Sequence, residues 1–302
     1  MSTSKNFKGV IPPVSTIFTE DGTFDTEGMG KLINNLITRG VDGLFFLGTG
    51  GEFSQLSVDE RKQVAEYAVK EVNGRVPVLI GTGSTSTRDV LVLNEHAKKI
   101  GADGVVVINP FYMKLSEENL YHHYSRIAKA ADLPVLLYNF PALTGQDLSA
   151  DFILKLVKEH DSIVGIKETV DNINHIREVI HTVKGYKPDF SVLCGFEDLF
   201  LNTLSLGGDG IIAATGNFAP ELSIDLYRSF RKEEYTKVLE LNEQLTNLPA
   251  IYKLDSPFIN VIKEAIAECG LEISTAVLPP SGKLSADKKE QLKKILSDIK
   301  LR

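Results

Sequence analysis

The fold of this chain is constrained most by a regular alternation of short apolar runs with amphipathic stretches. Each apolar run is bounded by polar residues and is typical of a buried strand. Near-continuous apolar runs indicate parallel strands that are covered on both faces. The eight runs are residues 10–18, 41–47, 76–80, 104–108, 134–138, 163–167, 190–194 and 210–214. Eight strands in strict alternation with helices predict a single closed (β/α)8 barrel, the TIM barrel, rather than an open Rossmann sheet.

Helical patterns separate these runs and continue beyond the eighth. Ser57 is followed three residues later by Glu60, the capping-box pattern of a helix start, and Pro220 suits a first helical turn. The predicted helices are residues 26–39, 57–72, 87–100, 116–131, 149–159, 171–183, 199–205, 220–231, 233–246, 257–269 and 285–299. The last three exceed what a barrel needs. We therefore expect a barrel over residues 1–232 and a C-terminal helical extension over residues 233–302, packed on it as one structural unit.

Charge and cysteine content limit the classes of partner. The net charge of -7 argues against nucleic acid or an anionic membrane as the main partner. No stretch is long and apolar enough to span a membrane, and the N-terminus lacks the apolar segment of a signal peptide. Only two cysteines occur, Cys194 and Cys269, which does not suit a secreted disulfide scaffold. We expect a cytoplasmic protein that binds small molecules.

The sixth run ends in a lysine, Lys167, within the sequence I-V-G-I-K-E-T. A lysine at the end of a buried strand lies between a low-dielectric wall and a cleft. Desolvation disfavours the ammonium form of such a side chain and leaves a usable amine nucleophile. Taken alone, this lysine fits a simpler interpretation better, in which it caps the strand and extends its charged end to water.

The residues at the other strand ends favour the interpretation of Lys167 as a reactive amine. Active sites of (β/α)8 barrels lie at the C-terminal ends of the strands. Here those ends bring together Lys167, Tyr138 and Tyr112 with hydroxyl side chains and glycine-rich turns. A lysine beside a tyrosine on the adjacent strand is the minimum for imine chemistry, because the amine adds to a ketone and the phenol moves the protons.

Other chemistries find less support in the sequence. The turn G-T-G-G-E-F lacks the Lys-Ser or Lys-Thr of a P-loop, and G-T-G-S-T-S lacks the third glycine of a dinucleotide site. Both suit tight turns, or backbone N–H groups that bind a carboxylate. The six histidines fall in predicted helices or near their ends, without metal-ligand spacing, so no metal site is expected.

Four motifs together resemble the dihydrodipicolinate synthase/N-acetylneuraminate lyase family of class I Schiff-base aldolases, over nearly the whole chain. They are G-T-G-G-E at 48–52, Y-N-F-P at 138–141, G-I-K-E-T at 165–169 and G-G-D-G at 207–210. The resemblance implies an imine between Lys167 and the keto carbon of pyruvate or another 2-keto acid. It also implies that Tyr138 is the acid/base, with Thr49 and Tyr112 completing a proton relay. Tyr112 would be supplied across a subunit interface, so a homotetramer, a dimer of dimers, is implied.

Two departures from the synthase pattern bear on the substrate. Gly50 stands where the synthases typically have a second threonine, and Leu143 stands where they have an arginine. Without that guanidinium, the carboxylate of aspartate semialdehyde would be poorly paired. The sequences G-E-F-S-Q-L, N-F-P-A-L-T-G-Q-D-L and V-L-C-G resemble 2-keto-3-deoxygluconate aldolases more closely.

We therefore predict reversible cleavage of a 2-keto-3-deoxy sugar acid to pyruvate and an aldehyde such as glyceraldehyde. No cofactor is expected, because the covalent imine on Lys167 replaces a Lewis acid. The backbone at Thr49 and Gly50 is expected to hold the substrate carboxylate. The other predicted substrate-binding residues are Thr169, Gly195, Glu197, Ile212 and Asn217. Open alternatives are dihydrodipicolinate synthase, N-acetylneuraminate lyase, a sugar-acid dehydratase using the same imine, and a non-catalytic 2-keto-acid-binding protein.

Overall fold

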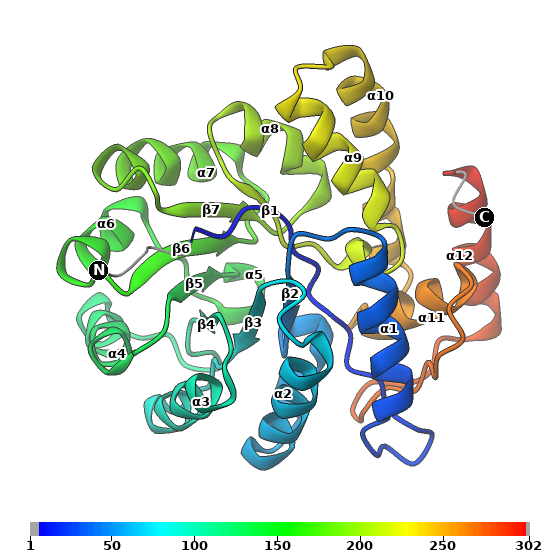
Figure 1. Ribbon diagram of the computed structural model, residues 1–302, viewed down its shortest axis with the longest axis horizontal. Coiled ribbons are helices and arrows are strands. Elements are labelled where there is room, and N and C mark those ends of the chain that lie inside the picture. Colours follow the sequence, from blue (N-terminus) through cyan, green and yellow to red (C-terminus); the bar gives the residue numbers. More distant parts are fainter. Residues whose placement is uncertain (1–5, 300–302) are drawn as a thin grey trace.

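Eight parallel strands form the centre of the molecule, and helices surround them (Figure 1). The structure is a computed structural model that describes residues 6–299. The strands are β1 (Gly9–Val10), β2 (Leu44–Phe46), β3 (Val78–Gly81), β4 (Gly104–Ile108), β5 (Val135–Asn139), β6 (Ile163–Glu168), β7 (Ser191–Cys194) and β8 (Gly210–Ile211). They pair in the order β1-β8-β7-β6-β5-β4-β3-β2, and a parallel bridge between Pro13 and Phe45 joins the two ends. The predicted TIM barrel is confirmed.

Twelve α-helices are present in residues 6–299. They are α1 (Thr26–Thr38), α2 (Val58–Val72), α3 (Thr87–Ile100), α4 (Glu117–Ala130), α5 (Pro141–Thr144), α6 (Ala150–Glu159), α7 (Ile173–Val179), α8 (Phe200–Ser205), α9 (Pro220–Arg231), α10 (Tyr235–Leu245), α11 (Ile259–Glu268) and α12 (Ala286–Asp298). None of them is long and apolar enough to cross a membrane.

Side-chain caps fix several helices where the chain leaves the strand ends. The capping box predicted at Ser57 and Glu60 is present, with both hydrogen bonds formed. Caps also start α1, α3, α4, α6 and α7, at Asp25, Ser86, Ser116, Ser149 and Asn172. Each such cap contributes about 1 kcal/mol to helix stability. Because these caps follow the strands, they also hold the loops at the mouth of the barrel in place.

The first and last strands are shorter than predicted. The first strand is only Gly9–Val10, so the run 10–18 contributes Val10 alone, because Pro12 and Pro13 follow and have no N–H group to donate to a ladder. The run 210–214 contributes only Gly210–Ile211, because the chain turns into a 3-10 helix at Ala214–Asn217. Both segments still pass the mouth of the barrel.

The predicted helix 171–183 is also divided. It begins at Ile173 because the Asn172 side chain accepts hydrogen bonds from the backbone N–H groups of Asn174 and His175. Its last turn is a π-helix, Ile180–Lys184.

The C-terminal helices α10, α11 and α12 lie together along one side of the barrel (Figure 1). Helix α10 packs on α9, and α11 packs on both α12 and the turn at Thr49–Gly51. A six-residue 3-10 helix, Leu248–Lys253, connects α10 with the segment that precedes α11. The extension therefore reaches the mouth of the barrel.

Candidate active site

A cavity of about 320 Å³ lies at the C-terminal ends of the strands. Its polar side chains are those of Thr49, Tyr138, Lys167, Thr169 and Tyr252. The other side chains in its wall are apolar: Pro13, Phe140, Ala142, Leu143, Phe196, Ile212, Ala214 and Phe258. Gly50 and Gly195 complete the wall. The cavity thus combines a small polar group with a large apolar surface.

The polar group is centred on Lys167. In the sheet Lys167 on β6 is paired with Tyr138 on β5, so the two side chains leave neighbouring strands on the same side. The Lys167 Nζ donates a hydrogen bond of 3.1 Å to the Tyr138 hydroxyl, which lies 3.2 Å from Thr49 Oγ1. Both strand residues are buried, Lys167 at 4% and Tyr138 at 2% exposure. An amine, a phenol and an alcohol therefore form one chain of hydrogen bonds in the cavity.

Aromatic rings support this chain. The Lys167 Nζ lies 4.2 Å from the centroid of the Tyr138 ring and 5.5 Å from that of Phe45. Phe45 packs against Tyr138 in an edge arrangement, with ring centroids 6.4 Å apart, and Phe140 stacks with Tyr138 at 6.1 Å. Within residues 6–299, no carboxylate forms an ion pair with Lys167. A buried amine without a carboxylate partner is free to react with a carbonyl carbon.

The Thr49 hydroxyl is placed by a short 3-10 turn, Thr49–Gly51. No side chain caps the start of this turn, and the first N–H groups of a helical turn have no partner within it. Glu52 ends the turn in a left-handed conformation with φ of 59° and is completely buried. Its carboxylate pairs with Lys263 of α11, so the extension holds the turn from behind.

Three predicted substrate contacts, Thr169, Gly195 and Ile212, line the cavity. Thr169 is buried, its N–H donates to the carbonyl of Asn139 at 2.8 Å, and its hydroxyl has no hydrogen-bond partner. A Cβ at position 195 would lie 2.0 Å from Thr169 Oγ1, so only glycine leaves room for this hydroxyl. An unpartnered buried hydroxyl in a cavity wall is available to a ligand.

Glu197 and Asn217 do not line the cavity, although the sequence suggested both. Burial raises the pKa of Glu197, whose Oε1 accepts hydrogen bonds from Tyr252 and from the hydroxyl and N–H of Thr215. Asn217 donates to the carbonyls of Pro13 and Ala214 and accepts from the N–H of Ser15. Asn217 therefore holds loops in place, and a direct contact of either residue with a substrate stays a prediction.

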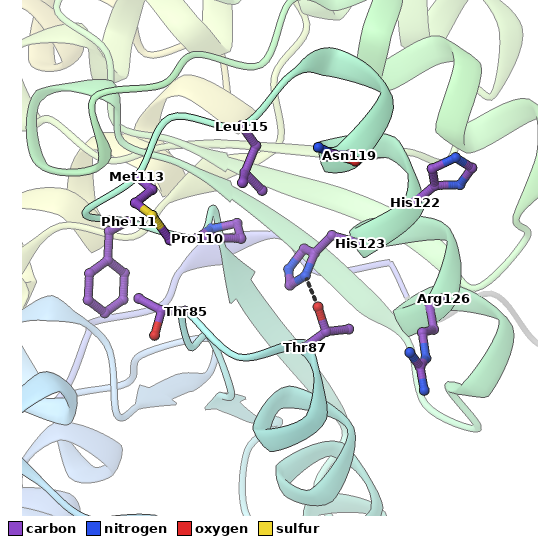
Figure 2. Close-up of a pocket in the computed structure, with 10 residues that line it drawn as sticks. All are labelled: Thr85, Thr87, Pro110, Phe111, Met113, Leu115, Asn119, His122, His123 and Arg126. Atoms are coloured by element: carbon purple, nitrogen blue, oxygen red, sulfur yellow. Dashed lines mark hydrogen bonds between the residues drawn. The ribbon is translucent and has the colours of Figure 1, made fainter.

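Tyr112 lies apart from the other predicted catalytic residues in this single chain. Its side chain is 95% exposed, and its backbone has the unusual φ of 78°. Its neighbours Phe111 and Met113 line a second cavity of about 310 Å³, between the loops that follow β3 and β4 and helix α4 (Figure 2). There His123 is hydrogen-bonded to Thr87 at 2.8 Å. The proposed role of Tyr112 therefore depends on a second copy of the chain.

Four aromatic side chains of the cavity wall were not among the predicted site residues, although the sequence positions of two of them indicated a place at the mouth of the barrel. Phe140 and Phe196 come just after the predicted ends of the fifth and seventh strands, where residues at the mouth are expected. Tyr252 and Phe258 belong to the C-terminal extension and contact each other at 5.1 Å between ring centroids. No sequence pattern places a C-terminal segment over a strand end nearly a hundred residues earlier, because that contact depends on the packing of whole helices.

The opposite face of β6 carries a second polar cluster, made of Glu168, His175, Asp147 and Asn139. The His175 Nε2 lies 3.3 Å from Asp147, and its Nδ1 lies 3.6 Å from Glu168. The hydrogen bond to Asp147 raises the pKa of His175 to about 9, whereas burial raises the pKa of Glu168 to about 8. The two carboxyl groups face opposite nitrogens of the His175 ring, and both also accept from Asn139 Nδ2, at 2.7 Å for Asp147 and 3.0 Å for Glu168. Among the described residues no group of three His, Cys, Asp or Glu is arranged to hold a metal ion.

The comparisons with known proteins cover the whole barrel. Residues 6–299 match the model of the dihydrodipicolinate synthetase family. The chain is 53% identical over 301 residues to the putative 2-dehydro-3-deoxy-D-gluconate aldolase YagE of Escherichia coli K12, covering 100% of both chains. It is 49% identical over 293 residues to the probable 2-dehydro-3-deoxy-D-pentonate aldolase YjhH of the same organism, covering 97% of each.

A solved structure agrees with these relatives. The crystal structure of YagE in complex with pyruvate has a TM-score of 0.97 to this structure at 53% identity, covering 98% of this chain and 99% of that one. The resemblance inferred from the four motifs is confirmed, and so is the prediction of a pyruvate-dependent aldolase or lyase at the level of the family. The chain belongs to the dihydrodipicolinate synthetase family.

Proposed function

We propose that this protein cleaves a 2-keto-3-deoxy sugar acid reversibly to pyruvate and an aldehyde such as glyceraldehyde. The observation that carries this proposal is the Lys167 amine, 3.1 Å from the Tyr138 hydroxyl in a cavity that has no other cationic side chain among the described residues. The relatives YagE and YjhH are named for 2-dehydro-3-deoxy acids, which is another term for the same compounds.

The geometry supports a reaction through an imine. The Lys167 amine adds to the C2 carbonyl of the substrate, and water leaves. The imine then accepts the electron pair of the C3–C4 bond as that bond breaks. Tyr138 takes the proton of the C4 hydroxyl, and the aldehyde leaves. Protonation of C3 and hydrolysis of the imine release pyruvate and restore the amine.

The turn at Thr49 and Gly50 would position the other groups. Thr49 is hydrogen-bonded to the Tyr138 hydroxyl, and the N–H groups at the uncapped turn of Thr49 and Gly50 would hold the substrate carboxylate.

Tyr138→Phe should lower kcat/KM for pyruvate release by about 10²- to 10⁴-fold, because the C4 proton then has no positioned acceptor. The change keeps the ring that packs on Phe45 and Phe140. A steady-state assay of pyruvate release measures the effect, with the melting temperature as the control for folding. Activity within threefold of the unmodified enzyme would contradict the role of the phenol.

Leu143 distinguishes the proposed aldolase from a dihydrodipicolinate synthase. It lines the cavity from the short helix Pro141–Thr144 at 55% exposure, at the position where the synthases have an arginine. An apolar side chain gives no partner to the carboxylate of aspartate semialdehyde. We expect pyruvate release from 2-keto-3-deoxygluconate to have a higher kcat/KM than condensation of pyruvate with aspartate semialdehyde. The opposite order would refute our interpretation of Leu143.

We also propose a homotetramer, in which Tyr112 enters the cavity of a neighbouring subunit. Tyr112 and Met113 are adjacent, apolar and exposed, at 95% and 66%. A tyrosine with a positive φ and an almost fully exposed side chain suits a residue that is ordered by a partner. Sedimentation at micromolar concentration gives the oligomeric state, and a monomer with full activity would exclude this arrangement.

We also propose that residues 1–232 form the barrel, that residues 233–302 form an extension packed on it, and that the two parts are one structural unit. The ion pair of Glu52 with Lys263 and the hydrogen bond of Glu197 with Tyr252 join them. We also propose a cytoplasmic location, because a chain with only two cysteines, Cys194 and Cys269, does not suit a secreted disulfide scaffold.

A further inference from the structure

Strand β6 has one extra residue where it pairs with β5. Val135 is paired with Ile163, but the next residue of β5, Leu136, is paired with Gly165, so Val164 between them forms a bulge. Because side chains alternate between the two faces of a strand, a shift of one residue would turn Lys167 away from the cavity. The register of the two strands beyond this bulge therefore determines whether the amine meets a phenol.

Beyond the bulge, a side-chain hydrogen bond joins the two strands at their last residues. Asn139 ends β5 and Glu168 ends β6, and they form the pair directly after that of Tyr138 with Lys167. The Asn139 Nδ2 donates to Glu168 Oε2 at 3.0 Å, on the face opposite the cavity, and the Glu168 side chain is completely buried. The N–H of Leu148 donates to Asn139 Oδ1 at 3.2 Å, which orients the amide nitrogen toward the carboxyl group.

The backbone of the same two residues holds the wall of the cavity. The carbonyl of Asn139 accepts the N–H of Thr169 at 2.8 Å, and the carbonyl of Glu168 accepts the N–H of Gly195 at 2.6 Å. Thr169 and Gly195 both line the cavity. A movement of Asn139 against Glu168 would therefore displace this wall together with the reacting side chains.

We propose that Asn139 and Glu168 are positioning residues, whose hydrogen bond fixes the register of β5 and β6 and keeps the Tyr138 hydroxyl within reach of the Lys167 amine. Neither residue lines the cavity, so both act through their neighbours on the strands. A misplacement of about 1 Å between reacting groups can cost about 100-fold in rate. The inference rests on the proposed imine reaction, but it does not depend on which 2-keto-3-deoxy acid is cleaved.

Glu168→Met and Glu168→Gln test this bond as a matched pair. Both side chains resemble glutamate in length, but only the amide oxygen of glutamine accepts a hydrogen bond from Asn139 Nδ2. Glu168→Met should lower kcat for pyruvate release by about 10- to 100-fold with KM within about threefold, because proton transfer needs the aligned phenol and binding does not. Glu168→Gln should keep both constants within about threefold of those of the unmodified enzyme.

Both variants are expected to fold, because Asn139 Nδ2 also donates to Asp147 at 2.7 Å and so keeps a partner. Circular dichroism and the melting temperature check this. An unchanged kcat in Glu168→Met overturns the proposal, and so does a kcat in Glu168→Gln as low as that of the methionine variant.

Asn139→Ala removes the same bond from the other strand. It should lower kcat as Glu168→Met does, and the double variant should be no slower than the slower single variant, because both changes remove one shared interaction. The N–H of Leu148 keeps its bond to Asp147 at 2.9 Å. Asp147→Ala is the control, since it removes the other acceptor of Asn139 Nδ2 and leaves the bond between the strands. Additive losses in the double variant, or an equal loss in Asp147→Ala, overturn the assignment.

Exchange of the methyl protons of pyruvate for deuterium separates this inference from the proposed function. In deuterium oxide, the imine on Lys167 loses a proton from C3 to give the enamine, which then takes up deuterium at C3. This exchange needs the amine and the phenol but no aldehyde. If Glu168→Met exchanges these protons as fast as the unmodified enzyme, the positioning role is wrong and the imine chemistry stands. If the unmodified enzyme shows neither exchange nor an adduct trapped by borohydride, the proposed function fails instead.

Discussion

Lys167→Ala is expected to abolish pyruvate release, with a loss in kcat of at least about 10⁴-fold, as for removal of other covalent nucleophiles. The reason is that every proposed step after substrate binding passes through the imine on this amine. No other lysine lines the cavity in the described part of the chain, so no neighbouring amine replaces it. Borohydride reduction in the presence of pyruvate, followed by mass spectrometry, should label the unmodified enzyme on Lys167 and leave the variant unlabelled.

Folding provides the control for this variant. Lys167 is 4% exposed and has no carboxylate partner in residues 6–299, so its removal leaves no opposite charge buried alone. Lys167→Met fills most of the same volume and should melt at or above the temperature of the unmodified protein. An adduct that persists in either variant would show that the nucleophile lies elsewhere.

The sequence was sufficient for the barrel because its signal is repeated and local. Each strand is a short apolar run, and most of the following helices begin at a side-chain cap, as at Ser57 and Ser116. Parallel neighbours in a (β/α)8 barrel follow chain order, so the adjacency of β5 and β6 follows from counting. That adjacency, with Tyr138 and Lys167 in register, is what brings the phenol to the amine.

The far end of the cavity was harder to predict, because it depends on side-chain partners distant in sequence. Glu197 and Asn217 stand at strand ends, where a sequence argument expects ligand contacts, yet their polar atoms bond to Tyr252 and to the loop at Pro13. Likewise, Phe258 is one of several aromatic residues in a segment that the sequence marks only as helical. Its place in the wall follows from how α11 packs on the barrel.

A buried ion pair joins that extension to the catalytic turn. Lys263 and Glu52 are both completely buried, with Nζ and Oε2 2.5 Å apart. Lys263 also donates to the carbonyl of Ala276 at 2.7 Å, and Glu52 Oε1 accepts the N–H of Leu278 at 2.8 Å. Burial lowers the pKa of Lys263, and the Glu52 carboxylate opposes that change. Both charges are therefore paired and hydrogen-bonded, which is the condition for tolerating them in a core.

Lys263→Met should destabilise the protein by about 3–5 kcal/mol, because it leaves the Glu52 carboxylate buried without a countercharge. Urea unfolding, or thermal unfolding if the transition is irreversible, measures this loss. The double variant Glu52→Gln with Lys263→Met removes both charges and should recover much of the stability. A double variant no more stable than Lys263→Met would show that the destabilisation does not arise from the unpaired carboxylate.

The same pair should matter for catalysis, because Glu52 ends the turn that carries Thr49. In the double variant, a folded protein with a displaced turn should lose kcat/KM for pyruvate release while still forming the borohydride-trapped adduct on Lys167. Glu264→Gln is the matched control. Like Glu52, Glu264 is a buried carboxylate, but it belongs to α11 and pairs with Lys289 and Thr275 rather than with a residue of the turn. If both variants lower kcat/KM equally at the same stability, Glu52 has no special role in positioning Thr49.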